Sequence, residues 1–200
     1  VPFVGVHNVM NAMQVLAAAC VLGVAFDDSC ARLESAAAPP GRLERLNARL
    51  HVYVDFAHTD GALEAVLKSL REIIDPGAML LVVVGCGGDR DQTKRPRMAA
   101  VATSLADRVW LTSDNPRTED PDAILADMLT GVASDDTKRV QVEPDRRRAI
   151  YDAIAAAGPH DIVLIAGKGH ERVQIIGAES MPFDDRKVAA EALKKAGWAT

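Results

Sequence analysis

The 200-residue sequence has few cysteines, no excess of positive charge and no long hydrophobic run. Its three cysteines, Cys20, Cys30 and Cys86, are too few and too widely spaced for a zinc knuckle or a disulfide framework, so we expect reduced thiols and a cytoplasmic location. A formal net charge of −5, with 26% charged residues, argues against a general nucleic-acid or membrane-surface binder. The apolar stretch at residues 15–26 is too short to span a bilayer and has neither a basic leader nor a cleavage site.

Two common nucleotide-binding motifs are also missing from these residues. Gly85, Gly87 and Gly88 follow an aliphatic run, and glycine at such a place lets the backbone turn tightly or approach a ligand. The loop matches neither Gly-x-Gly-x-x-Gly nor Gly-x-x-x-x-Gly-Lys-Ser/Thr. The sequence therefore argues against a dinucleotide site and contains no P-loop.

The first forty residues differ in pattern from the rest. Residues 8–23 and 28–37 are predicted to be helices, the first with Asn8 as its N-cap and Gly23 as its stop. The Pro-Pro-Gly at 39–41 cannot continue a helix and indicates a domain boundary, which gives domains of residues 1–38 and 39–200. Because the chain begins at Val1 and opens directly into a helical pattern, we expect further protein to precede it.

Beyond this boundary, strand-like and helix-like segments alternate. Such alternation indicates βαβ units and a mostly parallel sheet, and buried parallel strands have unbroken aliphatic runs such as 79–84. We therefore predict a Rossmann-like α/β fold. The expected strands are 51–56, 79–84, 108–112, 139–142, 161–166 and 173–176, and the expected helices are 60–74, 97–106, 122–132, 146–157 and 184–196.

Three polar loops follow three of these strands, at residues 85–91, 114–121 and 166–171. Ligands of open α/β sheets bind outside the carboxyl ends of the strands. We therefore expect the three loops to form one site.

The 114–121 loop contains Asn115 and Arg117. A guanidinium can hold a carboxylate through two parallel hydrogen bonds, and an amide offers both a donor and an acceptor, so the pair suits an amino-acid head group. The structural alternative is a turn in which Thr118 or Asp120 caps the next helix, and we expect one of them to do so.

The other two loops leave alternatives open. Glu171 can bind an ammonium group or be a surface charge, and His170 is as compatible with a backbone-satisfied histidine as with catalysis. Lys94 and Arg95 are expected to form a solvated loop face. Cys86 has no His–Asp partner in its local sequence, which argues against a catalytic thiol.

Seven motifs, in order, resemble the C-terminal part of a Mur ligase of the kind that adds the third amino acid to UDP-N-acetylmuramoyl-L-alanyl-D-glutamate. They are Asn8-Val9-Met10-Asn11-Ala12, Gly41-Arg42-Leu43-Glu44, Val54-Asp55-Phe56-Ala57-His58-Thr59, Gly85-Cys86-Gly87-Gly88-Asp89-Arg90, Asp114-Asn115-Pro116-Arg117, Gly167-Lys168-Gly169-His170-Glu171 and Phe183-Asp184-Asp185-Arg186. They run through nearly the whole chain. The sequence departs from the usual family pattern at His7 for Phe, Phe56 for Tyr and Asp60-Gly61 for Pro-Asp.

The resemblance implies a meso-diaminopimelate site. Arg90 would hold the carboxylate of the incoming amino acid, with Asn115 beside it, and Arg117 would bind the distal carboxylate. Gly167 and Glu171 would bind the ammonium at the distal centre.

The resemblance also implies an ATP site. Asn11 would contact the adenine, Arg42 the nucleotide or its γ-phosphate after domain closure, and Asp55 the ribose hydroxyls. Residues 1–38 would be the last helices of a central ATPase domain, and the P-loop and the Mg²⁺ ligands would lie upstream. We therefore expect neither a metal ligand nor a catalytic residue in this chain, and we expect the chain alone to be inactive. Its role would be to bring the amine to an acyl phosphate. The substrates would be meso-diaminopimelate, UDP-MurNAc-dipeptide and ATP, with no nucleic-acid or membrane partner.

Two other functions fit the sequence less well. A lysine-adding or folylpolyglutamate-type ligase would share the fold, but a lysine side chain has no distal carboxylate to pair with Arg117. A non-catalytic Rossmann-like module that senses an amino acid or nucleotide would explain the missing P-loop, and an upstream Gly-x-x-Gly-Lys-Thr would exclude it.

Overall fold

The computed structural model describes residues 4–47 and 49–198, apart from the side chains of Val6 and His7, so the departure at His7 lies outside the described side chains. The chain divides into two compact units, Val1–Pro39 and Pro40–Thr200. This division falls one residue after the predicted boundary. Within the described ranges, no helix is both long and apolar enough to cross a membrane.

The first unit consists of two helices, α1 (Val6–Val21) and α2 (Phe26–Glu34). The prediction that Asn8 caps α1 is wrong, because the helix begins earlier and its N-cap is Gly5. The Asn8 side chain lies inside the first turn and donates from Nδ2 to the Val4 carbonyl at 2.8 Å. The predicted stop at Gly23 is confirmed: its φ of 83° is left-handed, and its N–H reaches the Cys20 carbonyl at 3.0 Å.

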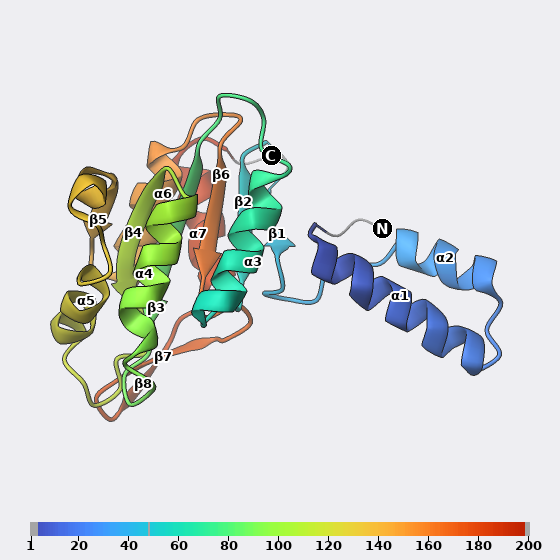
Figure 1. Ribbon diagram of the computed structural model, residues 1–200, viewed down its shortest axis with the longest axis horizontal. Helices are drawn as coiled ribbons and strands as arrows, with labels where there is room; N and C mark the ends of the chain where they lie inside the picture. The colour runs from blue at the N-terminus through green and yellow to red at the C-terminus, as the bar shows by residue number, and fades with distance from the viewer. Residues whose placement is uncertain (1–3, 48, 199–200) are drawn as a thin grey trace. The chain divides into compact units, whose positions relative to one another are not determined.

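The second unit contains a six-stranded sheet in the order β1-β2-β6-β3-β4-β5 (Figure 1). Every neighbouring pair is parallel except β1 and β2. The predicted Rossmann-like α/β fold is thus confirmed. The strands are β1 (Glu44–Arg45), β2 (His51–Asp55), β3 (Leu80–Cys86), β4 (Arg108–Ser113), β5 (Val140–Val142) and β6 (Ile162–Ala166).

Helices cover both faces of this sheet, α3 and α4 on the near face in Figure 1 and α6 and α7 behind it. Side chains alternate between faces along a strand, and Leu81 and Val83 of β3 pack with residues of α6 and α7. All of β3 is buried, which explains its unbroken aliphatic sequence. The helices are α3 (Asp60–Arg71), α4 (Lys94–Leu105), α5 (Pro121–Leu129), α6 (Arg146–Ala156) and α7 (Asp185–Lys195).

Side-chain caps fix where four of these helices begin. The cap of α5 is Asp120, which accepts the Asp122 N–H, so one of the two capping residues predicted in this loop is confirmed. Thr59, Asp145 and Asp184 cap α3, α6 and α7 in the same way. Because the helices follow the strands, these caps lie at the carboxyl edge of the sheet and set the paths of its loops.

A hairpin that the sequence predicted only in part lies outside the main sheet. The predicted strand at Val173–Ile176 (β7) is present, but it pairs with an unpredicted strand, β8 (Glu179–Pro182). Most of the hairpin is exposed, so it lacks the aliphatic run that marks a buried strand. Its backbone contacts the 114–121 loop, since the Arg117 N–H reaches the Ile175 carbonyl at 3.0 Å. A short 3₁₀ helix at Ser134–Arg139 and strand β1 were also unpredicted.

Candidate functional site

A cavity of about 410 Å³ lies at the carboxyl edge of the sheet, the lower end of the sheet in Figure 1. The three polar loops converge on it as predicted. Its lining contains all five residues predicted to bind an amino acid, Arg90, Asn115, Arg117, Gly167 and Glu171, together with Phe56, His58, Thr59, Gly87, Asp91, Lys94 and Asp114. The structure therefore brings these side chains together, and their individual roles stay predictions.

The glycines of the 85–91 loop allow two loops to pack backbone against backbone. A Cβ atom on Gly88 would lie 1.8 Å from the Pro116 carbonyl oxygen, and one on Gly85 would lie 2.9 Å from the Asp114 backbone nitrogen. The Gly88 N–H also donates to the Asn115 carbonyl at 2.9 Å. Close approach of the 114–121 loop, rather than a positive φ, is therefore what requires glycine here.

One end of the cavity, lined by Asn115 and Glu171 and backed by the buried Lys168, is built from hydrogen-bonded side chains, and we call it the Glu171 end. Asn115 donates from Nδ2 to Glu171 Oε2 at 2.8 Å, and its Oδ1 accepts from the Ile175 N–H at 3.0 Å. Lys168 Nζ donates to Asn115 Oδ1 at 2.9 Å and to Glu171 Oε2 at 3.2 Å. Within the described part of the chain, Glu171 Oε1 has no hydrogen-bond donor, so this oxygen can accept from a ligand.

Asp114 and Gly167 line the cavity beside this end. Asp114 is buried, and burial raises the pKa of its carboxyl group, an effect that the Arg146 guanidinium and the Lys168 ammonium oppose. Gly167 has a φ of 115°, which only glycine adopts readily, and a Cβ there would lie 3.1 Å from Asp114 Oδ2. The backbone conformation thus requires glycine at this position. Because glycine has no side chain, none lies beside the Gly167 carbonyl on its own residue.

Arg90 and Arg117, which also line the cavity, carry positive charge with few internal partners, and we call this part of the lining the Arg117 end. Arg117 Nη1 donates to the Gly88 carbonyl at 2.7 Å. Among the described residues, the one hydrogen-bond acceptor of Arg90 is the Asp89 carbonyl, at 3.2 Å. No partner within residues 4–47 and 49–198 occupies Nε or Nη2 of Arg117, so its guanidinium can still bind a carboxylate.

The prediction that Lys94 and Arg95 form a solvated face is wrong. Arg95 is 1% exposed, and its two Nη atoms bind Asp127 and Glu119 at 2.8 Å. Lys94 lines the cavity and donates to the His58 carbonyl at 2.7 Å. The reason is that α4 begins at Lys94, earlier than predicted, so that Arg95 faces α5. No local pattern predicts this pairing, because the partners come from a separate helix and loop.

Cys86 is buried beneath the cavity. Burial raises the pKa of its thiol to about 12, so the group is protonated near neutral pH. Its Sγ lies 3.5 Å from the Sδ atom of Met98. These observations agree with the sequence-based argument against a catalytic thiol.

The residues predicted to bind the nucleotide lie in both units. Asn11 is exposed on α1 in the first unit. In the second unit, Asp55 is 7% exposed and accepts the backbone N–H groups of Leu43 and Ala57, both at 2.7 Å. The Leu43 contact places Arg42 with its guanidinium carbon 4.8 Å from the centre of the Phe56 ring. The nucleotide roles stay predictions.

Phe56 also contacts the histidine whose role the sequence left open. The rings of His170 and Phe56 lie 4.9 Å apart, and His170 is exposed. The backbones of Gly41 and Gly169 touch beneath these rings, because a Cβ on Gly41 would lie 2.2 Å from the Gly169 carbonyl carbon. Arg42, Phe56 and His170 therefore form an exposed cationic and aromatic surface.

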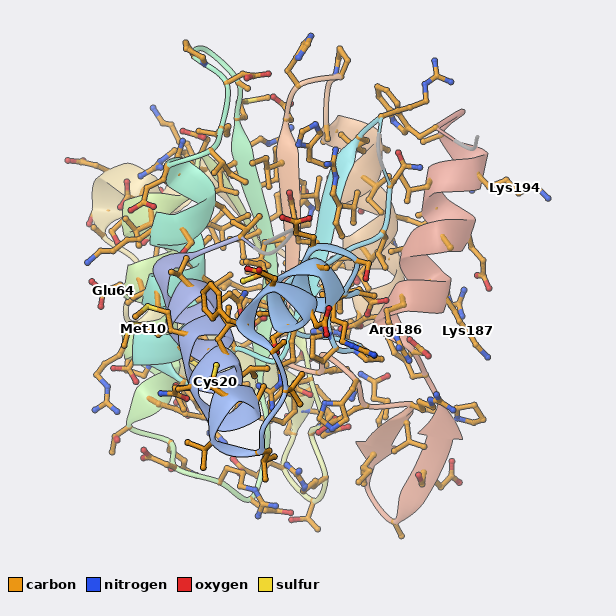
Figure 2. All side chains as sticks on the ribbon, turned by 90° about the vertical axis from the view of Figure 1, so that its right-hand side faces the viewer. Met10, Cys20, Glu64, Arg186, Lys187 and Lys194 are labelled. Carbon is orange, nitrogen blue, oxygen red and sulfur yellow. The ribbon has the colours of Figure 1, made fainter. Side chains whose placement is uncertain are left out.

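Arg146 and Asp185 support the site from below, and the sequence analysis did not single out their pairing. Both side chains are fully buried, and their two hydrogen bonds measure 2.8 and 2.7 Å. Arg146 also donates to the Ala166 carbonyl at 3.0 Å, so the pair ties the end of β6 to α7. Asp185 belongs to one of the seven motifs, but nothing distinguishes Arg146 within the run Arg146-Arg147-Arg148. Figure 2 shows the next residue, Arg186, at the start of α7, where it pairs with Asp184 at 2.8 Å.

A parallel sheet covered on both faces, with a polar cavity at its carboxyl edge, defines an α/β ligand-binding domain. Residues 41–169 match the family model described as Mur ligase, glutamate ligase domain. The chain belongs to this family.

Two relatives and a solved structure at 40–47% identity carry the name of one ligase. The chain is 46% identical over 198 residues to the UDP-N-acetylmuramoyl-L-alanyl-D-glutamate–2,6-diaminopimelate ligase of Thermosynechococcus vestitus, covering 97% of this chain and 39% of that protein. It is 47% identical over 195 residues to the ligase of the same name from Synechococcus elongatus, covering 96% and 38%. A solved structure of a ligase with this name superposes with a TM-score of 0.77 at 40% identity, covering 99% of this chain and 40% of that one. The chain thus spans about two fifths of the length of these relatives.

Proposed function

We propose that this chain forms the amino-acid-binding part of an ATP-dependent ligase that adds meso-diaminopimelate to UDP-N-acetylmuramoyl-L-alanyl-D-glutamate in peptidoglycan precursor synthesis. The observation that carries the proposal is that one cavity offers both guanidinium groups, at the Arg117 end, and carboxylate and carbonyl acceptors, at the Glu171 end. The names of the relatives support it.

Diaminopimelate carries two amino-acid head groups, and this cavity offers partners for both kinds of charge. We assign Arg90 to the carboxylate nearer the reacting amine and Arg117 to the distal carboxylate. The distal ammonium would donate to Glu171 Oε1 and to the Gly167 carbonyl. Asn115 is 4% exposed and bonded on both sides of its amide, so its contribution is to hold Glu171 as well as to contact the ligand.

The phosphate chemistry is proposed to come from the remainder of the whole protein. The 200 residues contain no P-loop, and the described residues include no group of three or more histidine, cysteine or acidic side chains that could hold a metal ion. The described residues therefore do not offer a Mg²⁺ site by themselves. We propose that α1 and α2 are the last helices of an ATPase domain, and that Asn11, Arg42 and Asp55 contact ATP.

The role of the chain in catalysis is then to position the amine. In an acid–amine ligation, ATP phosphorylates the acceptor carboxylate, the amine attacks the acyl phosphate, and phosphate leaves. Holding the amine at the acyl carbon replaces a bimolecular encounter by an intramolecular step. We propose that the whole protein acts in the cytoplasm, and its three free thiols agree with that location.

The test is substrate-dependent ADP release by the protein that the whole gene encodes. With ATP and UDP-N-acetylmuramoyl-L-alanyl-D-glutamate present, we expect ADP release to require meso-diaminopimelate, and the 200-residue chain alone to release none. ADP release that does not depend on diaminopimelate would contradict the proposal, and acceptor-dependent release by the 200-residue chain would contradict the assignment of the phosphate chemistry to the rest of the protein.

A further inference from the structure

Lys168 is a fully buried charge that the proposed ligand contacts do not use. Its side chain is 0% exposed, and its Nζ lies within reach of three acceptors: Asn115 Oδ1 at 2.9 Å, Glu171 Oε2 at 3.2 Å and Asp114 Oδ1 at 3.5 Å. All three acceptor residues line the cavity, whereas Lys168 does not. A buried ammonium is costly unless it is paired and hydrogen-bonded, so these contacts hold the two loops in a fixed relation.

The backbone explains how Lys168 reaches this place. It lies between Gly167 and Gly169, with φ values of 115° and 52°, both in the region that favours glycine. Two such turns in succession direct the Lys168 side chain beneath the 114–121 loop. The sequence Gly-Lys-Gly thus serves a buried lysine, not a phosphate loop.

Lys168 also decides which way the Asn115 amide faces. Asn115 Oδ1 accepts from both Lys168 Nζ and the Ile175 N–H, so the opposite orientation would place the NH₂ group against two donors. With the oxygen held, Nδ2 must face Glu171 Oε2. Two donors then occupy Oε2, which leaves Oε1 as the Glu171 oxygen that is open to a ligand.

We propose that Lys168 is a positioning residue that orients Asn115 and Glu171 so that Glu171 Oε1 receives the distal ammonium of the amino-acid substrate. This inference rests on the proposed function. It predicts a selective effect: loss of Lys168 weakens the recognition of the distal ammonium and leaves the recognition of the carboxylates largely intact.

The experiment compares two amino acids on the whole protein with ATP and UDP-N-acetylmuramoyl-L-alanyl-D-glutamate saturating. One is meso-diaminopimelate, and the other is L-2-aminopimelate, which keeps the reacting amine and both carboxylates but lacks the distal ammonium. For Lys168→Met, we expect kcat/KM for diaminopimelate to fall about 30-fold, mainly through KM, and kcat/KM for 2-aminopimelate to change less than about threefold. The matched control is Lys68→Met, since Lys68 is 60% exposed on α3, and neither value should change.

The outcomes separate the two proposals. Equal losses for both amino acids, or no loss for diaminopimelate, would overturn the positioning role while leaving the ligase function intact. A wild-type protein that does not use diaminopimelate would overturn both.

A second measurement covers the case in which Lys168→Met does not fold, as judged by circular dichroism. Lys168→Gln keeps a donor for Asn115 and is expected to retain diaminopimelate kcat/KM within about tenfold of wild type. In a Glu171→Gln background, Lys168→Gln should change diaminopimelate kcat/KM less than about threefold, because Lys168 acts through Glu171. If the loss of kcat/KM in the double variant equalled the product of the losses in the two single variants, Lys168 would act independently of Glu171, and the inference would be overturned.

Discussion

The two ends of the cavity contain charged groups that are held in different ways. At the Glu171 end, Asn115 and Lys168 are buried and their polar atoms are bonded to each other, to Glu171 and to the Ile175 backbone. At the Arg117 end, Arg117 is half-buried and Arg90 is exposed, and each binds little more than a nearby carbonyl. Arg117 also has a left-handed φ of 53°, which is unfavourable for a residue other than glycine.

The difference indicates whether folding or ligand binding satisfies the polar groups at each end. Folding alone assembles the Glu171 end, because its groups satisfy one another without a ligand. The Arg117 end keeps unpaired donors that a carboxylate would satisfy, so the free energy gained there comes from the ligand. Selectivity at the Arg117 end can therefore change at little cost to the fold, whereas a change at the Glu171 end affects stability and binding together.

The largest expected effect is the discrimination between meso-diaminopimelate and L-lysine. Lysine lacks the second carboxylate and would leave the Arg117 guanidinium without its partner. Because Arg117 is only half-buried and keeps its bond to the Gly88 carbonyl, we expect kcat/KM for lysine to be about 10³-fold lower, less than the 10⁴ or more that a fully buried site reaches. Parallel ADP-release assays on the whole protein measure this ratio. Similar values for the two amino acids would show that the Arg117 end does not select the substrate.

Removing the guanidinium itself should have the next largest effect. Arg117→Ala deletes a charge-assisted contact of about 3–4 kcal/mol and should raise the KM for diaminopimelate by roughly two to three orders of magnitude, with little change in the KM for ATP. The matched control is Arg148→Ala on α6, since the Arg148 side chain is 71% exposed. If both substrates were affected equally, Arg117 would be a structural residue.

A substitution at the other end should act on stability. Asn115→Leu leaves the Ile175 N–H without its acceptor and removes one of the three acceptors of the buried Lys168 ammonium, and we expect a loss of about 3 kcal/mol in the free energy of unfolding. Arg117→Leu introduces the same side chain at the Arg117 end and should cost less than about 1 kcal/mol. Urea unfolding of the two variants measures both values. Equal losses would remove the distinction between the two ends.

The smallest expected effect concerns Asp114 and pH. Burial raises the pKa of Asp114 in the folded protein above the ordinary pKa that it has in the unfolded chain. Ionisation of Asp114 therefore begins to destabilise the fold once the pH exceeds that ordinary pKa, and the loss of stability is complete above the raised pKa. Asp114→Asn removes this penalty and should be more stable than wild type by roughly 1 kcal/mol at pH 7.5. The advantage should shrink as the pH falls through the raised pKa. Urea unfolding across this pH range is the measurement, and an advantage that grew at low pH would show that the sign is wrong.

Much of the fold could be predicted from local pattern. The aliphatic runs of β3 and β6 mark strands that are buried on both faces, and Gly23 marks the end of α1. Helix starts were less predictable. Asn8 has the chemistry of an N-cap but lies inside the first turn, and α4 begins earlier than its apolar pattern suggests, which buries Arg95.

The candidate site was predictable for a related reason. Polar loops that follow parallel strands meet at one edge of the sheet, so the sequence predicts that Arg90, Asn115, Arg117, Gly167 and Glu171 lie together, as the cavity lining shows. The resemblance to the Mur ligases then supplied the chemistry expected of each.

Local patterns in the chain were thus enough to predict the order of strands and helices, the edge at which the loops gather and the residue types that reach it, because these depend on periodicity and on residues that are close in the chain. Which charges are paired, and which stay open to a ligand, depends instead on contacts between distant residues that form only in the folded protein. Lys168 and Asn115 are 53 residues apart, and Arg146 and Asp185 are 39 apart, so no local pattern records their contacts. A buried ion pair forms only where folding brings two distant side chains into one desolvated space. The charges at the Glu171 end are paired in this way, and those at the Arg117 end are not.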